Sequence, residues 1–376
     1  MSAKVQIAQG THSREELEAI LADYYDISSP SGLLKSYKQL LGGYSGCSYA
    51  VELSDGDSRA VVKLSNGYTP DSAEFMCRTA RYLAAVGYED CCLPIPKTKK
   101  CDKYEFVSLN YQPTPAFLLT HVEGQQADKV MRDSPNLAPT VMEGIGSGLG
   151  RMHACSSPLS KADATDKKLR YYEKDGGCCD VQDHLEDKCL SKIQASNSPA
   201  KVSFLPIYQK ELAALKKEMA VELEMGITHG DPFADNVLVE PDTGKLSAFI
   251  DIEDVCVGPL LFDLACCAIG SCFIMARDTD NQHPQVLDFT LLEALMKGYT
   301  SCRPLPPVER QHFVAHMRLT LLCNCSWRFC KFHCNNTKED VPQEAKDSYL
   351  ELQRRIEYLH EPEVVAAIEK VLEKLA

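Results

Sequence analysis

Long apolar runs are absent from this 376-residue sequence, and none reaches the roughly 18 apolar residues that a membrane-spanning helix needs. Residues 1–21 also lack the apolar core of a secretory signal peptide. We therefore expect no membrane partner, and these two absences predict a cytoplasmic protein.

Positive charge is also in short supply. The chain has 40 Lys and Arg against 53 Asp and Glu, which gives a formal net charge of -13. A nucleic-acid-binding protein needs a basic face, so we expect no nucleic-acid partner. The apolar share of 44% and the charged share of 25% are typical of a globular protein. The length allows one large domain or two lobes.

Cysteine is frequent, with 18 residues, but the spacings that mark zinc sites are missing. No C-x-x-C occurs anywhere in the chain. Most of these residues are expected to be reduced thiols that pack as small apolar groups. The group from Cys323 to Cys334, with His333 beside it, leaves a metal site open as an alternative to a plain helix.

The first 120 residues have the patterns of a small sheet with a helix. Ser13 and Glu16 form a capping box at the start of a short helix over 13–24. Strand-like segments from Tyr37 to Leu64 predict three antiparallel strands. A helix with an apolar face and two further strands are expected at 71–85, 104–110 and 116–122.

From residue 138 onward the pattern is mostly helical, with helices expected over 140–153, 205–225 and 362–375. Between the first two lies a polar segment, 155–205, which is rich in Lys, Asp and Ser. This segment is expected to be a long surface insertion or a lid. The chain as a whole predicts an α+β fold, with a small sheet region followed by a larger helical one.

A glycine-rich turn, "LGGYSGCSYAVEL" at 41–53, separates two of the expected strands. Small residues at such a turn let backbone N–H groups approach a phosphate closely. A plain hairpin turn has the same composition, so both interpretations stay open here. The turn does not match the G-x-x-x-x-G-K-[ST] loop, and a P-loop fold is not supported.

Lys63 lies inside the apolar run "AVVKL". Burial of a lysine is costly unless the charge is paired, so such a residue by itself usually points to solvent. However, a glycine-rich turn, a strand lysine and then a helix that carries Glu74 is the order found in kinase-type phosphoryl transfer. In that order the lysine contacts the phosphates of ATP and the glutamate orients the lysine.

The stretch "THGDPFADNVLVEPDTGKLSAFIDIEDV", residues 228–255, reads as a loop, a strand, a tight turn and a second strand. Asp231 precedes Asn236 by five residues, as in a kinase catalytic loop, and Asp251 ends the second strand. One hairpin thus brings a base and two oxygen ligands for Mg²⁺ to the same rim. The alternatives are a solvated turn and a zinc ligand at His229, which has no second ligand at the usual spacing.

At these residues the sequence resembles the aminoglycoside phosphotransferase and choline kinase superfamily, which has a protein-kinase-like fold. "HGDPFADN" and "IDIEDV" carry the resemblance, and "AVVKL", "LPIPKT", "AFLLTHVEGQ", "LGRMHA" and "GPLLFDLACCA" follow the order of the family. The resemblance spans roughly residues 35–335. It implies a bilobal enzyme, with a nucleotide-binding lobe over 1–120 and a catalytic and substrate-binding lobe over 121–376.

The resemblance also implies roles for single residues. Asp231 is the expected catalytic base, Asn236 and Asp251 are the expected Mg²⁺ ligands, and Lys63 with its partner Glu74 is expected to contact ATP. The turn over the phosphates and the adenine pocket are expected at Ser45, Gly46, Cys47, Ser48, Leu119, His121 and Val122. Glu253, an extra acid after the metal motif, is expected to face a cationic substrate or solvent.

Within the superfamily the sequence is most similar to homoserine kinases and hydroxylysine kinases, so the expected substrate is an amino acid with a side-chain hydroxyl. Its carboxylate calls for a bidentate arginine, and Arg328 or Arg318 is the candidate. Both residues have a structural interpretation as well. The resulting prediction is an ATP- and Mg²⁺-dependent kinase of a small-molecule hydroxyl.

Two alternatives remain. The acceptor is choline, ethanolamine or methylthioribose in the first, and choline would need an aromatic cage, for which Trp327, Phe329 and Phe332 are available. In the second the chain is a non-catalytic kinase-like scaffold. Such a protein usually loses the base, a metal ligand or the lysine, and all of these are present here.

Overall fold

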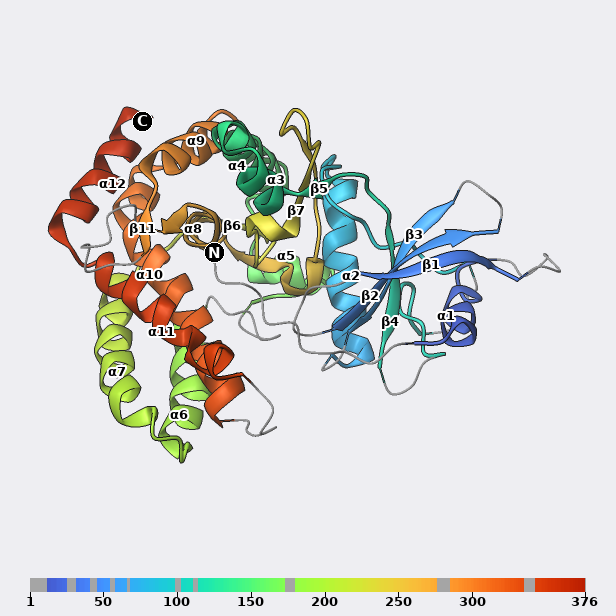
Figure 1. The fold of residues 1–376 in the computed structure, drawn as a ribbon, viewed down its shortest axis with the longest axis horizontal. Helices are drawn as coiled ribbons and strands as arrows, with labels where there is room; N and C mark the ends of the chain where they lie inside the picture. The colour runs from blue at the N-terminus through green and yellow to red at the C-terminus, as the bar shows by residue number, and fades with distance from the viewer. Residues whose placement is uncertain are drawn as a thin grey trace.

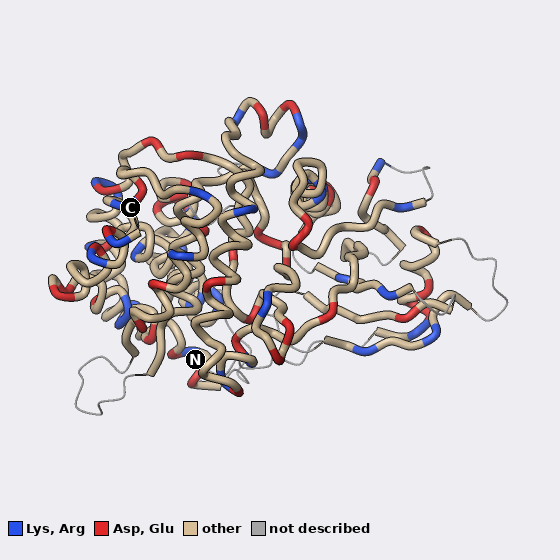
Figure 2. The backbone as a smooth tube through the Cα atoms, turned by 90° about the horizontal axis from the view of Figure 1, so that it is seen from above, with Lys and Arg blue, Asp and Glu red and all other residues tan. Residues whose placement is uncertain are grey.

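The structure is a computed structural model, and it describes residues 12–25, 32–40, 46–54, 58–65, 68–98, 103–110, 114–172, 180–275, 285–334 and 342–375. Figure 1 shows a small sheet with two helices at one end of the molecule and a larger, mostly helical region at the other. Basic and acidic residues are interspersed along both regions in Figure 2. None of the helices in the described ranges is long and apolar enough to cross a membrane.

The small sheet has four antiparallel strands in the order β1-β2-β3-β4. Their bounds are Leu34–Leu40, Gly46–Leu53, Arg59–Ser65 and Ala116–Thr120. The first three confirm the strands that we predicted over 37–64. The register places Lys63 of β3 between Ser48 of β2 and Phe117 of β4, so the lysine is on a central strand.

The strand predicted over 104–110 is wrong, because only Ser108 forms an isolated bridge, with Ala116. The physical reason is a competing acceptor. The carboxylate of Glu74 accepts hydrogen bonds from the backbone N–H groups of Glu105, Phe106 and Val107. Donors that are bound to a carboxylate are not available to a strand ladder.

Helix α1 (Arg14–Leu21) begins at the predicted capping box, in which Ser13 and Glu16 each accept from the other's backbone N–H. Its apolar face, Leu17, Ile20 and Leu21, is fully buried and belongs to a core that β1–β4 share. Helix α2 (Pro70–Ala85), by contrast, packs its buried residues Met76, Cys77, Ala80 and Leu83 into the core of the helical region. Helix α2 therefore lies between the two cores (Figure 1), and the division at residue 120 stays a prediction.

The helical region contains the long helices α4 (Ala138–Ser156), α7 (Lys201–Glu218), α8 (Leu260–Ser271), α9 (Phe289–Thr300), α10 (Pro307–Phe329), α11 (Gln343–Tyr358) and α12 (Pro362–Lys374). The shorter elements in this region include α3 (Ala127–Asp133), η1 (Pro135–Leu137), β10 (Phe273–Met275), β11 (Gln285–Leu287) and the π-helical η5 (Cys330–Cys334). The helix predicted over 205–225 is too long, since α7 ends at Glu218. Met225–Thr228 instead forms β6, whose backbone pairs with β9 (Cys256–Pro259).

The polar segment 155–205 contains α5 (Lys161–Asp166), the π-helical η2 (Val181–Leu190) and α6 (Ser191–Ala195). Leu185, Cys189 and Ile193 are buried in the main core, and the Tyr208 hydroxyl of α7 donates to the Leu185 carbonyl over 2.8 Å. This part is therefore attached to the core through its few apolar residues, and its role as an insertion or a lid stays a prediction. A few apolar residues anchor the segment although its composition is polar.

Helices α4 and α9 cross at unusually close range, because glycines line the contact. A Cβ atom on Gly146 would lie 2.1 Å from the Leu295 carbonyl oxygen, and one on Gly298 would lie 2.0 Å from the Glu143 carbonyl oxygen. Real Cβ atoms do not come so close to backbone oxygen. This crossing holds α4, which carries functional side chains described below, at a fixed distance from α9.

We predict that Gly146→Ala lowers the free energy of unfolding by roughly 1–3 kcal/mol, since the added methyl must push two backbones apart. Chemical denaturation followed by circular dichroism measures it. Gly144→Ala is the matched control on the same helix, because a Cβ there would find its nearest neighbour at 3.7 Å. The control should be neutral or up to about 1 kcal/mol more stable, and equal losses in both variants would contradict this packing argument.

Candidate active site

A β-hairpin brings the predicted metal ligands together. Strands β7 (Val237–Val239) and β8 (Leu246–Phe249) pair with Val237 opposite Phe249, and β5 (Gln125–Gln126) lies on the other side of β7. The Ile250 N–H also donates to the Asn236 carbonyl over 2.8 Å. Asn236 and Asp251 therefore lie on adjacent chain segments at the same rim, as the sequence spacing predicted.

Asn236 ends the short helix η3 (Ala234–Asn236) and touches Asp231 directly. Its side-chain Nδ2 donates to the Asp231 carbonyl oxygen over 2.9 Å and to the Asp231 carboxylate Oδ2 over 2.8 Å. Both partners are acceptors, which fixes the amide with its nitrogen toward Asp231. The amide oxygen then points away from Asp231, in the orientation that a ligand to a hard cation needs.

Asp251 has a left-handed backbone, with φ 64° and ψ 63°. A non-glycine residue in this region is uncommon, and it persists only where the surrounding structure holds it. The residue begins the short helix η4 (Ile252–Asp254), and 32% of its side chain is exposed. This conformation turns the chain sharply at the end of β8. The Asp251 side chain is partly exposed there, whereas Ile252 and Glu253 are buried.

Lys63 reaches this turn from β3. Its Nζ lies 3.1 Å from Asp251 Oδ1 and 3.3 Å from Glu253 Oε2. Burial lowers the pKa of the Lys63 ammonium, but the two carboxylates outweigh burial and raise the pKa above its ordinary value. Lys63 is thus a fully charged, buried cation with two anionic partners.

Glu74 is not the partner of Lys63, which corrects the sequence-based expectation. Its carboxylate lies 2.9 Å from Arg78 Nη2 and accepts the three amides of residues 105–107. Glu253 takes the position beside Lys63, with a second hydrogen bond from the Ser65 hydroxyl. Glu253 is only 5% exposed, so the interpretation that it faces solvent is wrong.

The predicted phosphate turn is described only in part. Ser45 lies outside the described residues, whereas Gly46, Cys47 and Ser48 form the start of β2. A Cβ on Gly46 would lie 2.4 Å from the Leu64 carbonyl oxygen, so glycine is required there for close pairing with β3. At the other edge of β3, Leu119 is buried in β4, while His121 and Val122, just past its end, are half-buried.

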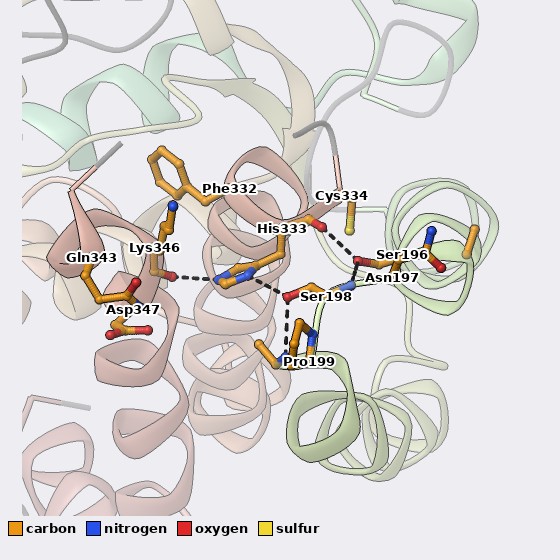
Figure 3. A pocket seen from close by; sticks show the side chains of 12 residues that line it. Ser196, Asn197, Ser198, Pro199, Phe332, His333, Cys334, Gln343, Lys346 and Asp347 are labelled. Atoms are coloured by element: carbon orange, nitrogen blue, oxygen red, sulfur yellow. Dashed lines mark hydrogen bonds between the residues drawn. The ribbon is translucent and has the colours of Figure 1, made fainter. Parts of the chain in front are cut away.

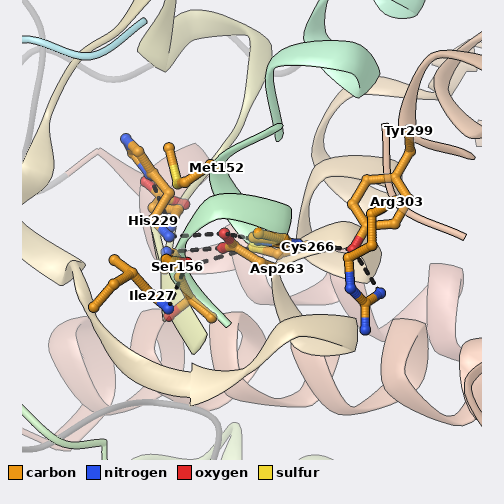
Figure 4. A network of polar contacts seen from close by, with 12 residues as sticks. Met152, Ser156, Ile227, His229, Asp263, Cys266, Tyr299 and Arg303 are labelled. Atoms are coloured by element: carbon orange, nitrogen blue, oxygen red, sulfur yellow. Dashed lines mark hydrogen bonds and ion pairs between the residues drawn. The ribbon is translucent and has the colours of Figure 1, made fainter. Parts of the chain in front are cut away.

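The turn that carries Asp231 is held by a buried carboxylate, Asp263 of α8 (Figure 4). Asp263 accepts the backbone N–H groups of His229, over 2.7 Å, and Gly230, over 2.8 Å. His153 Nε2 of α4 lies 3.1 Å from the same carboxylate, and both side chains are fully buried. Gly230 has φ +86°, which favours glycine, and a Cβ there would lie 2.5 Å from the Asp254 carbonyl oxygen.

This network extends away from the turn. The other ring nitrogen of His153 lies 2.8 Å from the Tyr299 hydroxyl of α9, which also accepts from Arg303 over 3.0 Å. Arg303 in turn makes a bidentate ion pair with Glu309 of α10 at 2.7 Å. The family resemblance included the motifs of both residues, "GPLLFDLACCA" for Asp263 and "LGRMHA" for His153, but sequence reasoning gave His153 no role.

A transition-metal site is not supported by the described residues. Within these ranges no group of three or more His, Cys, Asp or Glu side chains can hold a metal ion, and this includes the stretch from Cys323 to Cys334. His229 is bonded through Nε2 to the Ile250 carbonyl at 2.9 Å rather than to a zinc-type neighbour. Asp251 and the Asn236 amide are hard oxygen donors, which fit Mg²⁺ when phosphate oxygens complete the shell.

The arginines proposed to bind a substrate carboxylate differ in their contacts. Arg318 is buried and saturated by Glu211 and Glu218 of α7, at 2.8 Å each, so its candidacy is wrong. Arg328 is half-buried and donates to the Ser348 carbonyl of α11 over 3.1 Å. It keeps further guanidinium donors, and its role stays a prediction.

The three aromatic residues that the choline alternative would need do not form a cage. Phe329 is fully buried and stacks on Phe204 with ring centroids 4.4 Å apart. Lys331 lies over the ring of Trp327 at 4.4 Å and occupies that face. Phe332 instead lines the cavity in Figure 3, with residues of α11 and of the connection between α6 and α7. That cavity contains no motif residue, and its central His333 bonds Ser198 and the Lys346 carbonyl.

Comparison with known proteins assigns the family. The sequence pattern described as "Phosphotransferase enzyme family" matches residues 36–305. The chain belongs to this phosphotransferase family. A homoserine kinase from Brucella anthropi is 28% identical over 296 residues, which are 78% of this chain and 77% of that protein.

Solved structures agree on the fold. The amicoumacin kinase hAmiN, solved with AMP-PNP, Ca²⁺ and Ami, superposes with a TM-score of 0.64 at 12% identity, over 93% of this chain and 94% of that one. A choline/ethanolamine kinase family protein from Mesorhizobium loti gives 0.59 at 17% identity, over 96% and 99%. The predicted family, the kinase-like α+β fold and the class of phosphotransferase with an alcohol acceptor are confirmed.

The altered partner of Lys63 leads to a prediction. Glu253→Gln removes one of its two anions and should weaken ATP binding by about tenfold or more, in line with hydrogen bonds to charged groups. Glu74→Gln should change ATP affinity little but lower the unfolding temperature, since a neutral amide accepts fewer of the three N–H groups. Calorimetric titration with ATP and thermal unfolding check both. A larger loss of ATP affinity in Glu74→Gln than in Glu253→Gln would support the pairing of Lys63 with Glu74 that the sequence predicted.

Proposed function

We propose that this phosphotransferase moves the γ-phosphoryl group of ATP to the side-chain hydroxyl of a small amino acid such as homoserine or hydroxylysine, with Mg²⁺ as its cofactor. The observation that carries the proposal is the contact of Asp231 with Asn236, next to Asp251 and Lys63. A base, two oxygen donors and a buried cation are the parts that phosphoryl transfer uses.

Asp231 is proposed to accept the proton of the acceptor hydroxyl as that oxygen attacks the γ-phosphorus. The hydrogen bond from Asn236 Nδ2 holds its carboxylate in one orientation, and the amide anchors at Asp263 hold the backbone beneath it. A positioned carboxylate removes the entropic cost of bringing the base to the hydroxyl.

Asn236 and Asp251 are the residues that would hold Mg²⁺, through the amide oxygen and the carboxylate. When bound, the ion neutralises charge on the phosphates. Lys63 adds a fixed positive charge from β3, kept in place by Asp251 and Glu253. Ser48, opposite Lys63 in the sheet, and the segment of Leu119, His121 and Val122 are proposed to hold the phosphates and the adenine.

The amino-acid acceptor is supported by the likeness to the Brucella anthropi homoserine kinase. Arg328 is our candidate for its carboxylate. Arg328 lies on α10, is half-buried and donates to the Ser348 carbonyl of α11 over 3.1 Å.

A choline or ethanolamine acceptor is less well supported. This alternative is supported by the structural similarity to the Mesorhizobium loti protein, and that similarity concerns the fold alone. The aromatic side chains that a choline acceptor would need around its quaternary ammonium are separated, with Phe329 in the core. The alternative of a non-catalytic scaffold is not supported, because the proposed base, the proposed metal ligands and the lysine are all present. The cytoplasmic location stays a prediction.

An ADP-release assay tests the acceptor. Purified protein is incubated with ATP, Mg²⁺ and single acceptors: homoserine, hydroxylysine, choline, ethanolamine, methylthioribose and an aminoglycoside. Faster turnover with a hydroxy amino acid than with the others supports the proposal. A preference for choline or for the aminoglycoside would overturn the amino-acid assignment and leave the phosphotransferase class intact.

Asp231→Asn should lower turnover by about a hundredfold to ten-thousandfold, because an amide cannot accept the proton. ATP affinity and the unfolding temperature should be close to those of the wild type, since the side chain keeps its size. Steady-state rates and calorimetry measure these quantities. A folded variant with near-normal turnover would remove Asp231 from the proposed role.

Arg328→Lys keeps the charge and loses the planar fork of the guanidinium. With the preferred amino acid, kcat/KM should fall about tenfold to hundredfold while the KM for ATP is unchanged. Arg310→Lys, at a half-buried arginine that donates to the Leu305 carbonyl, is the matched control. Equal effects on ATP and acceptor would show that Arg328 supports the fold rather than the substrate.

A further inference from the structure

Arg170 is a buried arginine of the polar segment 155–205, and its side chain reaches the turn 251–254, which we call the metal motif. It follows α5 in the chain and is only 4% exposed. Its Nη1 donates to the Glu253 carbonyl oxygen, in the turn that follows Asp251. Nothing in the sequence pattern pointed to this residue, because the segment around it is polar and was expected to be a surface insertion or a lid.

Tyr68 is a second donor to the same carbonyl. Its hydroxyl donates to the Glu253 carbonyl over 3.2 Å, and its ring lies 5.8 Å from the Arg170 guanidinium carbon. Tyr68 lies between β3 and α2, in the sheet region, whereas Arg170 belongs to the helical region. The Glu253 carbonyl therefore accepts from two side chains, one from each region.

The backbone of Arg170 is anchored as firmly as its side chain. Its N–H donates to the Thr79 hydroxyl of α2 over 2.7 Å, and its carbonyl accepts from Val257 of β9 over 2.8 Å. Tyr172 donates back to the Val257 carbonyl over 3.2 Å. Arg170 is consequently fixed against α2 and against the strand that leads out of the metal motif.

The carboxylates of residues 251–254 indicate a role for the charge of Arg170. Residues 251–254 contain three carboxylates, Asp251, Glu253 and Asp254, and Lys63 pairs with two of them. When the phosphates of ATP bind beside Lys63, they share its charge, and the carboxylate-rich turn is left with less positive charge. Arg170 keeps a second cation beside the turn, and it does so through a contact that is independent of Lys63.

We infer that Arg170 is a positioning residue, which holds the turn 251–254 so that Asp251 keeps its left-handed backbone and directs its carboxylate toward a metal-bound nucleotide. The inference rests on the proposed function, because it assumes that Asp251 is a ligand of Mg²⁺. Arg170 itself acts on the backbone carbonyl of Glu253. It is expected to change how strongly Mg²⁺ enhances nucleotide binding, while leaving the acceptor site unchanged.

The test is calorimetric titration of the full chain with ATP, in the presence of Mg²⁺ and in its absence. Arg170→Met should reduce the Mg²⁺-dependent gain in ATP affinity by about tenfold or more, the size expected for a lost hydrogen bond to a charged group. Arg170→Lys retains a charged donor and should recover most of the gain. Tyr68→Phe, which removes the second donor to the same carbonyl, should give a smaller loss in the same direction.

Arg310→Met is the control, since Arg310 also donates to a backbone carbonyl, that of Leu305, over 2.7 Å. It should keep the full Mg²⁺-dependent gain, whatever its effect on the unfolding temperature. An unchanged gain in a folded Arg170→Met would overturn the inference. If that variant does not fold, unchanged gains in both Arg170→Lys and Tyr68→Phe would overturn it too, because neither alters the size of the core greatly.

The result is separable from the identity of the acceptor. If the wild-type chain binds ATP more tightly with Mg²⁺ but phosphorylates none of the tested hydroxyl compounds, the proposed acceptor is wrong and the Arg170 comparison still decides the inference. If Mg²⁺ has no effect on nucleotide binding in the wild type, the metal role of Asp251 is wrong, and the inference about Arg170 is overturned with it.

Discussion

The buried carboxylate of Asp263 is the contact on which the loop that carries Asp231 depends. Two backbone N–H groups, of His229 and Gly230, donate to it, so the loop before Asp231 has one permitted geometry. A buried charge is tolerated only when its hydrogen bonds are complete, and His153 completes them. Through His153 and Tyr299 the loop is connected to α4 and α9, whose glycine contact fixes their separation.

The second organising feature is the charge balance around the metal motif. Lys63 is held by two carboxylates of one short turn, and Arg170 grips the backbone of that same turn. The lysine is therefore oriented without the helix glutamate, which instead shapes the segment 105–107. This arrangement joins the sheet region to the helical region by ion pairs as well as by apolar packing.

The residue that we propose for binding the acceptor carboxylate belongs to the helical region. Helix α10 carries both arginines that we considered, yet Arg318 is committed to α7 and only Arg328 keeps donors to spare. Leu185, Cys189 and Ile193 of the polar segment 155–205 belong to the main core of this region. Family membership assigns the reaction class, and the contacts of the two arginines favour Arg328 over Arg318 as the proposed acceptor residue.

The sequence by itself determined features that depend on neighbours in the chain: the capping box at Ser13, the strands over 37–64, and the spacing that brings Asp231, Asn236 and Asp251 to one hairpin. Short-range geometry is sufficient for each of these. Only the tertiary structure decided the partners of Lys63. One of them, Asp251, lies 188 positions further along the chain. The tertiary structure also decided the loss of the strand at 104–110, the separation of Phe329 from Trp327, and the place of Arg170. These features result from competition between distant groups for the same donor, acceptor or core volume, and no local pattern records which one wins.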